Sequence, residues 1–231
     1  GIAERVAVPA DFALRIPDSM TFAQGAALPM NYLTMEFALI RRGGVQRGET
    51  VLIHGAAGGI GTAGIQISKA LGATVIAVAS TPEKREVAIA AGADHAIDVE
   101  GFLAASKELT DGRGVDVVVD PVGGDRFTDS LRALAPEGRV LVIGFTAGDI
   151  PTVKVNRLLL NNVDVRGVGW GAYAFMRPGY ISKQWASITH LLETGAIHPP
   201  VGAEYPLSDV ASAIADLGAR RAAGKIVVTL K

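Results

Sequence analysis

The sequence predicts an α/β protein built on a doubly wound parallel sheet, and three observations support this. Short apolar, β-branched runs recur through the chain and alternate with segments of helical pattern. The more apolar runs have few polar positions, as expected for parallel strands that are covered on both faces. A glycine-rich turn follows the run at residues 51–54 and opens into a helical segment, which is the order of elements in a nucleotide-binding unit.

The glycine-rich turn is the most informative element. It follows the strand expected over 51–54, spans residues 55–61 and precedes a helix expected over 62–71. It fits the pattern G-x-G-x-x-G, with Ala56 in the first place and then Gly58 and Gly61. Such a turn lets the backbone approach a pyrophosphate, and the following helix offers free N–H groups to it. The turn therefore predicts a dinucleotide ligand, whereas the alternative interpretation is a purely structural turn.

Further strands and helices follow in alternation. Expected strands cover residues 74–79, 95–99, 115–119, 139–145 and 163–168, and expected helices cover residues 82–91, 102–109, 126–134 and 181–193. Residues 22–42 also have apolar residues at helical spacing. These elements place a Rossmann domain over residues 22–195.

The two ends of the chain do not continue this alternation. A short extended piece is expected at residues 5–9, a helix at 208–219 and a closing strand at 225–230. Residues 1–21 and 196–231 are therefore assigned to a second, smaller domain.

Composition excludes several classes of protein. The 231 residues carry a net charge of −1, which gives no electrostatic basis for binding nucleic acid or an anionic membrane. No apolar run reaches the roughly 18 residues of a membrane span, and no signal peptide is recognisable. The absence of cysteine excludes thiolate metal sites and favours the cytoplasm. The four scattered histidines are interpreted as structural rather than as metal ligands.

The end of the second strand of the nucleotide-binding unit indicates which dinucleotide is bound. An acidic residue about 20 residues after the glycine turn would bind the ribose 2′-hydroxyl of NAD. Ser80, Thr81 and Lys84 lie there instead, which favours the 2′-phosphate of NADP(H). Glu83 is the exception and is expected to point away from the phosphate. The alternative is that Ser80 or Thr81 only caps the next helix and that Lys84 is a surface charge.

Together, several motifs resemble a known family. The sequences that carry the resemblance are AALP (26–29) with NYLT (31–34), GAAGGIG (55–61), GADH (92–95), VDPVGG (119–124), GRVLVIG (138–144) and GKIV (224–227). They resemble the zinc-independent quinone oxidoreductases of the zeta-crystallin type, in the medium-chain dehydrogenase/reductase superfamily.

The resemblance implies a Rossmann domain beside a GroES-like, β-rich substrate domain that is incomplete in this chain. By that comparison the cofactor lies between the two domains. The resemblance implies that Thr34 contacts the nicotinamide and that the pyrophosphate is held by Ala57, Gly58, Gly59, Ile60 and Gly61. It also implies that the 2′-phosphate is bound by Ser80, Thr81 and Lys84. Val122 and Phe145 are implied to flank the adenosine and nicotinamide halves of the cofactor. Zinc-dependent relatives carry a cysteine where this chain has Met30, so no metal is expected.

The resemblance also implies a function. We expect an NADPH-dependent oxidoreductase that transfers hydride to a quinone or an α,β-unsaturated carbonyl without a metal. No residue is a convincing general acid, and Tyr32 and Tyr173 are interpreted as packing residues rather than substrate contacts. A non-catalytic NADPH-binding module is the alternative. The strand at 163–168 is expected at a sheet edge, where it would join two copies into a homodimer.

Overall fold

A computed structural model describes residues 2–219 and 224–230 of the chain. The strands are β1 (Thr50–His54), β2 (Thr74–Val78), β3 (His95–Ile97), β4 (Val115–Asp120), β5 (Leu134–Val142), β6 (Asp164–Gly167), β7 (Val201–Pro206) and β8 (Lys225–Thr229). The helices are α1 (Phe22–Ala27), α2 (Pro29–Glu36), α3 (Gly59–Ala70), α4 (Pro82–Ala90), α5 (Phe102–Glu108), α6 (Phe127–Ala133), α7 (Asn156–Asn161), α8 (Trp170–Ala174), α9 (Tyr180–Glu193) and α10 (Val210–Gly218). Three short helical segments complete the set: η1 (Ala10–Phe12), the π-helical η2 (Phe37–Gly43) and η3 (Leu207–Asp209).

Six strands form one parallel sheet in the order β3-β2-β1-β4-β5-β6. The chain winds outward from β1 in one direction and from β4 in the other, so the predicted doubly wound fold is confirmed. The point at which the direction reverses lies between β1 and β4. In sheets of this kind, ligands bind beyond the carboxyl ends of the strands at that point.

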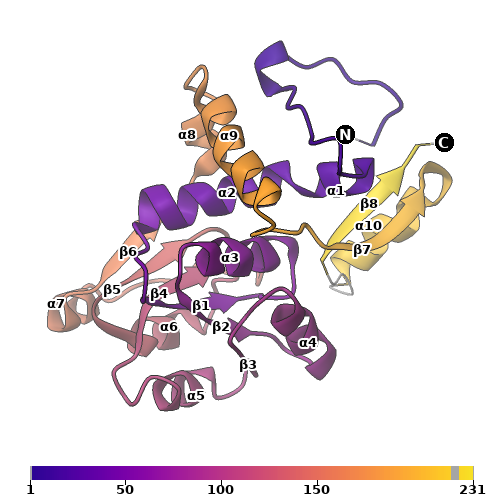
Figure 1. Ribbon diagram of the computed structural model, residues 1–231. Helices are drawn as coiled ribbons and strands as arrows, with labels where there is room; N and C mark the ends of the chain where they lie inside the picture. The colour runs from indigo at the N-terminus through magenta and orange to yellow at the C-terminus, as the bar shows by residue number, and fades with distance from the viewer. Residues whose placement is uncertain (1, 220–223, 231) are drawn as a thin grey trace.

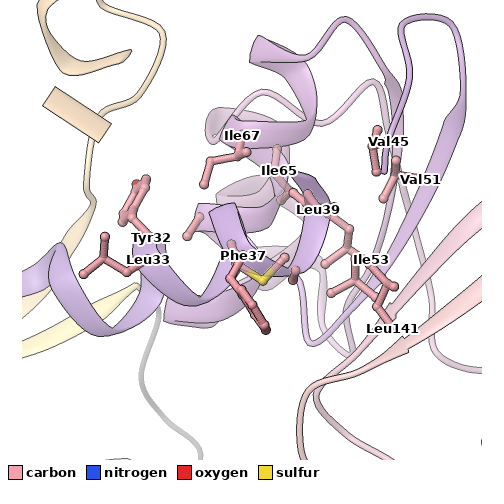
Figure 2. Close-up of a cluster of buried hydrophobic side chains, with 14 of the residues drawn as sticks. Tyr32, Leu33, Phe37, Leu39, Val45, Val51, Ile53, Ile65, Ile67 and Leu141 are labelled. Carbon is pink, nitrogen blue, oxygen red and sulfur yellow. The ribbon is translucent and has the colours of Figure 1, made fainter. Parts of the chain in front are cut away.

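Helices cover both faces of the sheet because neighbouring residues of a strand point to opposite sides. Val51 and Ile53 of β1 face the layer that contains α2, α3 and α9, whereas Leu52 faces the layer that contains α5 and α6. Figure 1 shows the two layers on opposite sides of the sheet. Figure 2 shows the first core, where side chains from α2, η2, α3 and the strands meet.

A second, smaller unit is formed by the C-terminal part of the chain. β7 and β8 pair in parallel, and α10 and the distant α1 pack against them. The unit adjoins the glycine turn, because Gly58 and Gly224 form an isolated β-bridge. The division at residues 21 and 195 remains a proposal, and residues 1, 220–223 and 231 of the predicted second domain lie outside the described part.

Some elements differ from the prediction. α3 begins at Gly59, three residues before the expected start, because the turn itself adopts helical geometry. β5 begins at Leu134 and contains Pro136 and Gly138, residues that usually interrupt a strand, so the sequence favoured a start at residue 139. α7, α8 and β7 were not predicted, since they are short or lie beside prolines and glycines. Residues 5–9, expected to be a short extended piece, belong to no helix or strand.

The buried histidine at the end of β1 predicts acid sensitivity. His54 is fully buried, its Nε2 lies 2.9 Å from Ser130 Oγ, and its ring contacts Phe102 edge-on. Burial lowers the pKa of His54 to about 3, so the folded chain holds a neutral ring, whereas the unfolded chain binds a proton below about pH 6.5. The free energy of unfolding should therefore fall by about 2 kcal/mol through this residue between about pH 7 and about pH 5.

Urea unfolding of the wild type and of His54→Gln at both pH values measures this contribution. We expect a smaller pH dependence in the variant, which lacks the titrating ring. Burial raises the pKa of Asp120, which works in the opposite direction and is common to both proteins. An equal pH dependence in the two proteins would contradict the assignment.

Candidate functional site

The loops that follow β1, β2, β4 and β5 meet at the carboxyl edge of the sheet. The N–H of Ala56 donates to the carbonyl of Val78 at the end of β2 (3.2 Å). The N–H of Ala147, after β5, donates to the carbonyl of Val122, after β4 (3.0 Å). A Cβ atom on Gly55 would lie 3.5 Å from Val122, which links the two pairs. The four loops that carry sequence-predicted residues therefore adjoin one another at the point where the winding of the sheet reverses.

Three glycines of the turn serve different purposes. Gly55 has a φ of +60°, a left-handed conformation that favours glycine. A Cβ atom on Gly61 would lie 2.4 Å from the carbonyl oxygen of Gly55, so α3 and the end of β1 approach too closely for any side chain. Among the residues that the structure describes, a Cβ atom on Gly58 would touch only that same oxygen, at 3.4 Å, so no described side chain fills the space in front of Gly58. The sequence pattern has Ala56 in the place of the first glycine, but the residue whose left-handed backbone favours glycine is the one before it, Gly55.

The N-terminus of α3 is suited to an anion. Its N-cap residue, Gly58, has no side chain, and the first N–H to find an acceptor is that of Thr62, which donates to Gly58. Among the described residues, the N–H groups of Gly59, Ile60 and Gly61 have no acceptor. Free N–H groups and the positive end of the helix dipole attract phosphate, so these residues fit a pyrophosphate.

The segment after β2 combines a helix cap with an exposed hydroxyl. Thr81 caps α4 by accepting a hydrogen bond from the N–H of Lys84 (3.3 Å). Ser80 is exposed. The Thr81 hydroxyl also bonds the Glu83 carboxylate, which lowers the pKa of Glu83 and keeps this group in the first turn of α4. The alternative that Thr81 caps the helix is therefore observed. Ser80 and Lys84 remain candidates for binding a 2′-phosphate.

The turn after β4 is held by an aspartate that the sequence analysis did not assign. Asp120 is buried, and its Oδ1 accepts from the N–H groups of Val122 (2.8 Å) and Gly123 (2.9 Å). A Cβ atom on Gly123 would lie 2.9 Å from the ring of Phe145, so the glycine allows that ring to approach. Val122 and Phe145 follow their strands by two and three residues, respectively.

Two polar side chains share one face of α2, and one of them, Asn31, contacts the glycine turn. Thr34 is 8% exposed and Asn31 is 6% exposed, and their spacing of three residues puts them on one face of the helix. The Asn31 amide lies directly against Gly59. The sequence analysis assigned Thr34 and missed Asn31, although the spacing of the pair is a detectable signal.

The two tyrosines considered as substrate contacts are engaged in packing. The Tyr32 hydroxyl is buried and donates to Gln66 Oε1 (2.7 Å), and burial raises the pKa of Tyr32. Tyr173 contacts Phe37, and the guanidinium of Arg177 lies 3.6 Å from the centre of its ring. Neither tyrosine is positioned by these contacts as a proton donor.

No metal centre is formed by the residues that the structure describes, since no three histidine or carboxylate side chains gather into a possible site. In the same part of the chain, no helix is long and apolar enough to cross a membrane.

Comparisons with known proteins place the chain in a known family. Residues 59–189, more than half of the chain, match the family described as "Zinc-binding dehydrogenase". The rat protein "Quinone oxidoreductase-like protein 2" is 39% identical over 220 residues, which cover 94% of this chain and 63% of the rat protein. This chain therefore spans less than two thirds of that relative.

Solved structures agree with this placement. A mycobacterial protein in complex with NADPH has a TM-score of 0.90 at 33% identity, over 96% of this chain and 69% of the other. The CurK enoyl reductase has a TM-score of 0.87 at 28% identity, over 97% of this chain and 67% of the other. The chain therefore belongs to the zinc-binding dehydrogenase family, in the quinone oxidoreductase branch of the medium-chain dehydrogenase/reductase superfamily.

Proposed function

We propose that this chain is the NADPH-binding part of an oxidoreductase that reduces a quinone or an α,β-unsaturated carbonyl without a metal. The observation that carries the proposal is the glycine turn. Among the described residues, no side chain fills the space in front of Gly58, and the N–H groups of Gly59, Ile60 and Gly61 have no acceptor. The relatives named quinone oxidoreductase-like and enoyl reductase support the two substrate classes.

The residues of the site divide the binding of the dinucleotide among them. The N–H groups of Gly59, Ile60 and Gly61 bind the pyrophosphate, with Gly58 beside it. Ala57, the other turn residue assigned to the pyrophosphate, is buried, and its carbonyl accepts from the N–H of Gly224 (2.9 Å), so its contribution is to hold the turn in place. Ser80 and Lys84 bind the 2′-phosphate, and this favours NADPH over NADH. Thr34 is assigned to the nicotinamide side.

The cofactor supplies the hydride when it is bound, and the protein supplies binding and orientation. The turn held by Asp120 fixes Val122, and the Phe145 ring packs against Gly123. We assign these two loops to one wall of the cofactor site. The remaining wall belongs to the substrate domain, which we propose is GroES-like and to which β7 and β8 contribute.

We also propose a cytoplasmic location.

A cofactor assay tests the function directly. NADPH binding is measured by fluorescence, and its oxidation at 340 nm is followed with a quinone and with an enone. Turnover of either acceptor supports the oxidoreductase. NADPH binding without turnover supports the non-catalytic module, and the absence of binding would overturn both.

The 2′-phosphate assignment predicts a loss of cofactor preference. Lys84→Ala should weaken NADPH binding by about 10-fold to 100-fold, because a charge-assisted contact contributes about 1.5–3 kcal/mol, and should leave NADH binding unchanged. Lys183→Ala, an exposed lysine of α9, serves as the matched control. An unchanged preference in Lys84→Ala would contradict the assignment.

The free edge of the sheet supports a homodimer. β6 is the last strand of the six, and the expected edge at residues 163–168 is therefore observed. The N–H of Val168 donates inward to Val142 (2.9 Å), so by the alternation of a parallel strand the N–H of Val165 points away from β5. We propose that a second copy pairs with this edge.

Replacement of the outward N–H tests the dimer. Light scattering should show a dimer for the wild type at micromolar concentration and a monomer for Val165→Pro, because proline removes an outward donor without removing a bond to β5. Circular dichroism confirms that the variant remains folded. A wild-type monomer, or a folded Val165→Pro dimer, would argue against pairing at this edge.

A further inference from the structure

The side chain of Asn31 occupies the space that a side chain at position 59 would need. A Cβ atom built on Gly59 would lie 2.3 Å from Asn31 Nδ2, 3.0 Å from its Cγ and 3.2 Å from its Oδ1. Gly59 is the first residue of α3, whereas Asn31 belongs to α2. The amide of one helix is therefore packed against the N-terminus of the other, with its nitrogen nearest to the glycine.

The side chain of Asn31 is held in the interior but has no hydrogen-bond partner. Asn31 as a residue is 6% exposed, and its amide makes no hydrogen bond to the described residues. Its amide atoms are not among the fully buried polar atoms without a partner, so they reach the surface beside the glycine turn, where a ligand can meet them. By contrast, the buried amide of Gln184 accepts from Trp170 Nε1 (2.7 Å) and donates to the carbonyl of Leu33 (3.2 Å). The side-chain amide of Gln184, on α9, thus has both a donor and an acceptor as partners, whereas the side-chain amide of Asn31 has neither.

The surroundings of Asn31 indicate what its partner would be. The N–H groups of Gly59, Ile60 and Gly61 also lack acceptors, and they lie at the same helix end. The three N–H groups and Asn31 Nδ2 are donors at the positive end of α3, so a shared partner for them is an acceptor with negative charge, whereas Asn31 Oδ1 is itself an acceptor and takes no part in this contact. A pyrophosphate offers several such oxygen atoms.

We propose that Asn31 is a further cofactor-binding residue, whose Nδ2 donates to the pyrophosphate of NADPH beside the N–H of Gly59. This inference rests on the proposed function and adds to it a ligand from α2. It also gives a role to the face of α2 that Asn31 shares with Thr34: Asn31 binds the anion, and Thr34 lies one turn further along. The competing explanation is that Asn31 only spaces α2 from α3.

Three ligands separate these explanations. NADPH contains the 2′-phosphate, the pyrophosphate and the nicotinamide; 2′-phospho-ADP-ribose lacks the nicotinamide; and 2′-AMP lacks both the nicotinamide and the pyrophosphate. Dissociation constants are measured by calorimetry, or by competition for the weaker ligands. The proteins are the wild type, Asn31→Ala, Asn31→Asp and, as a control, Met30→Ala, an exposed neighbour on the same helix.

Asn31→Ala should weaken NADPH and 2′-phospho-ADP-ribose by the same factor, about 10-fold, as expected for one hydrogen bond to a charged group. Asn31→Asp has nearly the same shape but replaces the donor with a negative charge. It should weaken both ligands more than alanine does, and the loss should diminish at high salt. Binding of 2′-AMP should not change in either variant, and Met30→Ala should behave as the wild type.

Each other outcome overturns the inference. Unchanged NADPH binding in Asn31→Ala and Asn31→Asp would show that Asn31 is only a spacer. An equal loss for all three ligands would indicate a general structural defect, and a loss for NADPH alone would place Asn31 at the nicotinamide. A wild type that does not bind NADPH would overturn the proposed function, whereas the other results overturn the role of Asn31 alone. Thermal unfolding without ligand confirms that each variant is folded. If Asn31→Ala does not fold, the binding of NADPH and 2′-phospho-ADP-ribose to Asn31→Asp, which keeps the shape of the side chain, decides between the explanations.

Discussion

The contact between Gly61 and the backbone at the end of β1 is the constraint on which the site depends. A Cβ atom at position 61 would lie within 2.5 Å of the Ala56 backbone, and backbone atoms cannot move aside as a flexible side chain can. The absence of a side chain lets the first turn of α3 rest on the chain that leaves the sheet. Because of this contact, the N–H groups of α3 point beyond the strand ends, where a ligand can reach them.

The rest of the sheet keeps this helix end among the other loops. The Ala56 N–H is bound to the end of β2, and the turn after β4 adjoins Gly55, since a Cβ atom there would lie 3.5 Å from Val122. At the opposite end of the sheet, Arg139 of β5 pairs with Glu49 just before β1 (2.7 Å), although another strand lies between them. The arrangement of the loops is thus fixed by contacts within the Rossmann unit.

The sequence predicted those features that depend on neighbouring residues along the chain. The strands β1, β2 and β4 are short runs rich in β-branched residues, and the glycines of the turn have a characteristic spacing, so both could be recognised. β7 could not, because it is half-buried, contains a glycine and ends at Pro206, and its pairing partner β8 lies some distance along the chain. Asn31 was missed because its contact with Gly59 exists only when α2 packs against α3. Asp120 bonds the N–H groups of Val122 and Gly123, which follow it directly in the chain, so its role as a turn residue was a local signal that the sequence analysis did not use.

The relation between Asn31 and Gly59 shows why a glycine fingerprint alone describes such a site incompletely. Gly59 has helical backbone geometry that any residue could adopt, so its lack of a side chain is not required by the turn. What occupies the vacant position is an amide from α2. An alanine at position 59 would displace that amide while leaving the turn and its N–H groups in place. Gly59 is therefore better understood as one half of a contact between two helices, whose other half, Asn31, brings a side-chain donor to the end of α3.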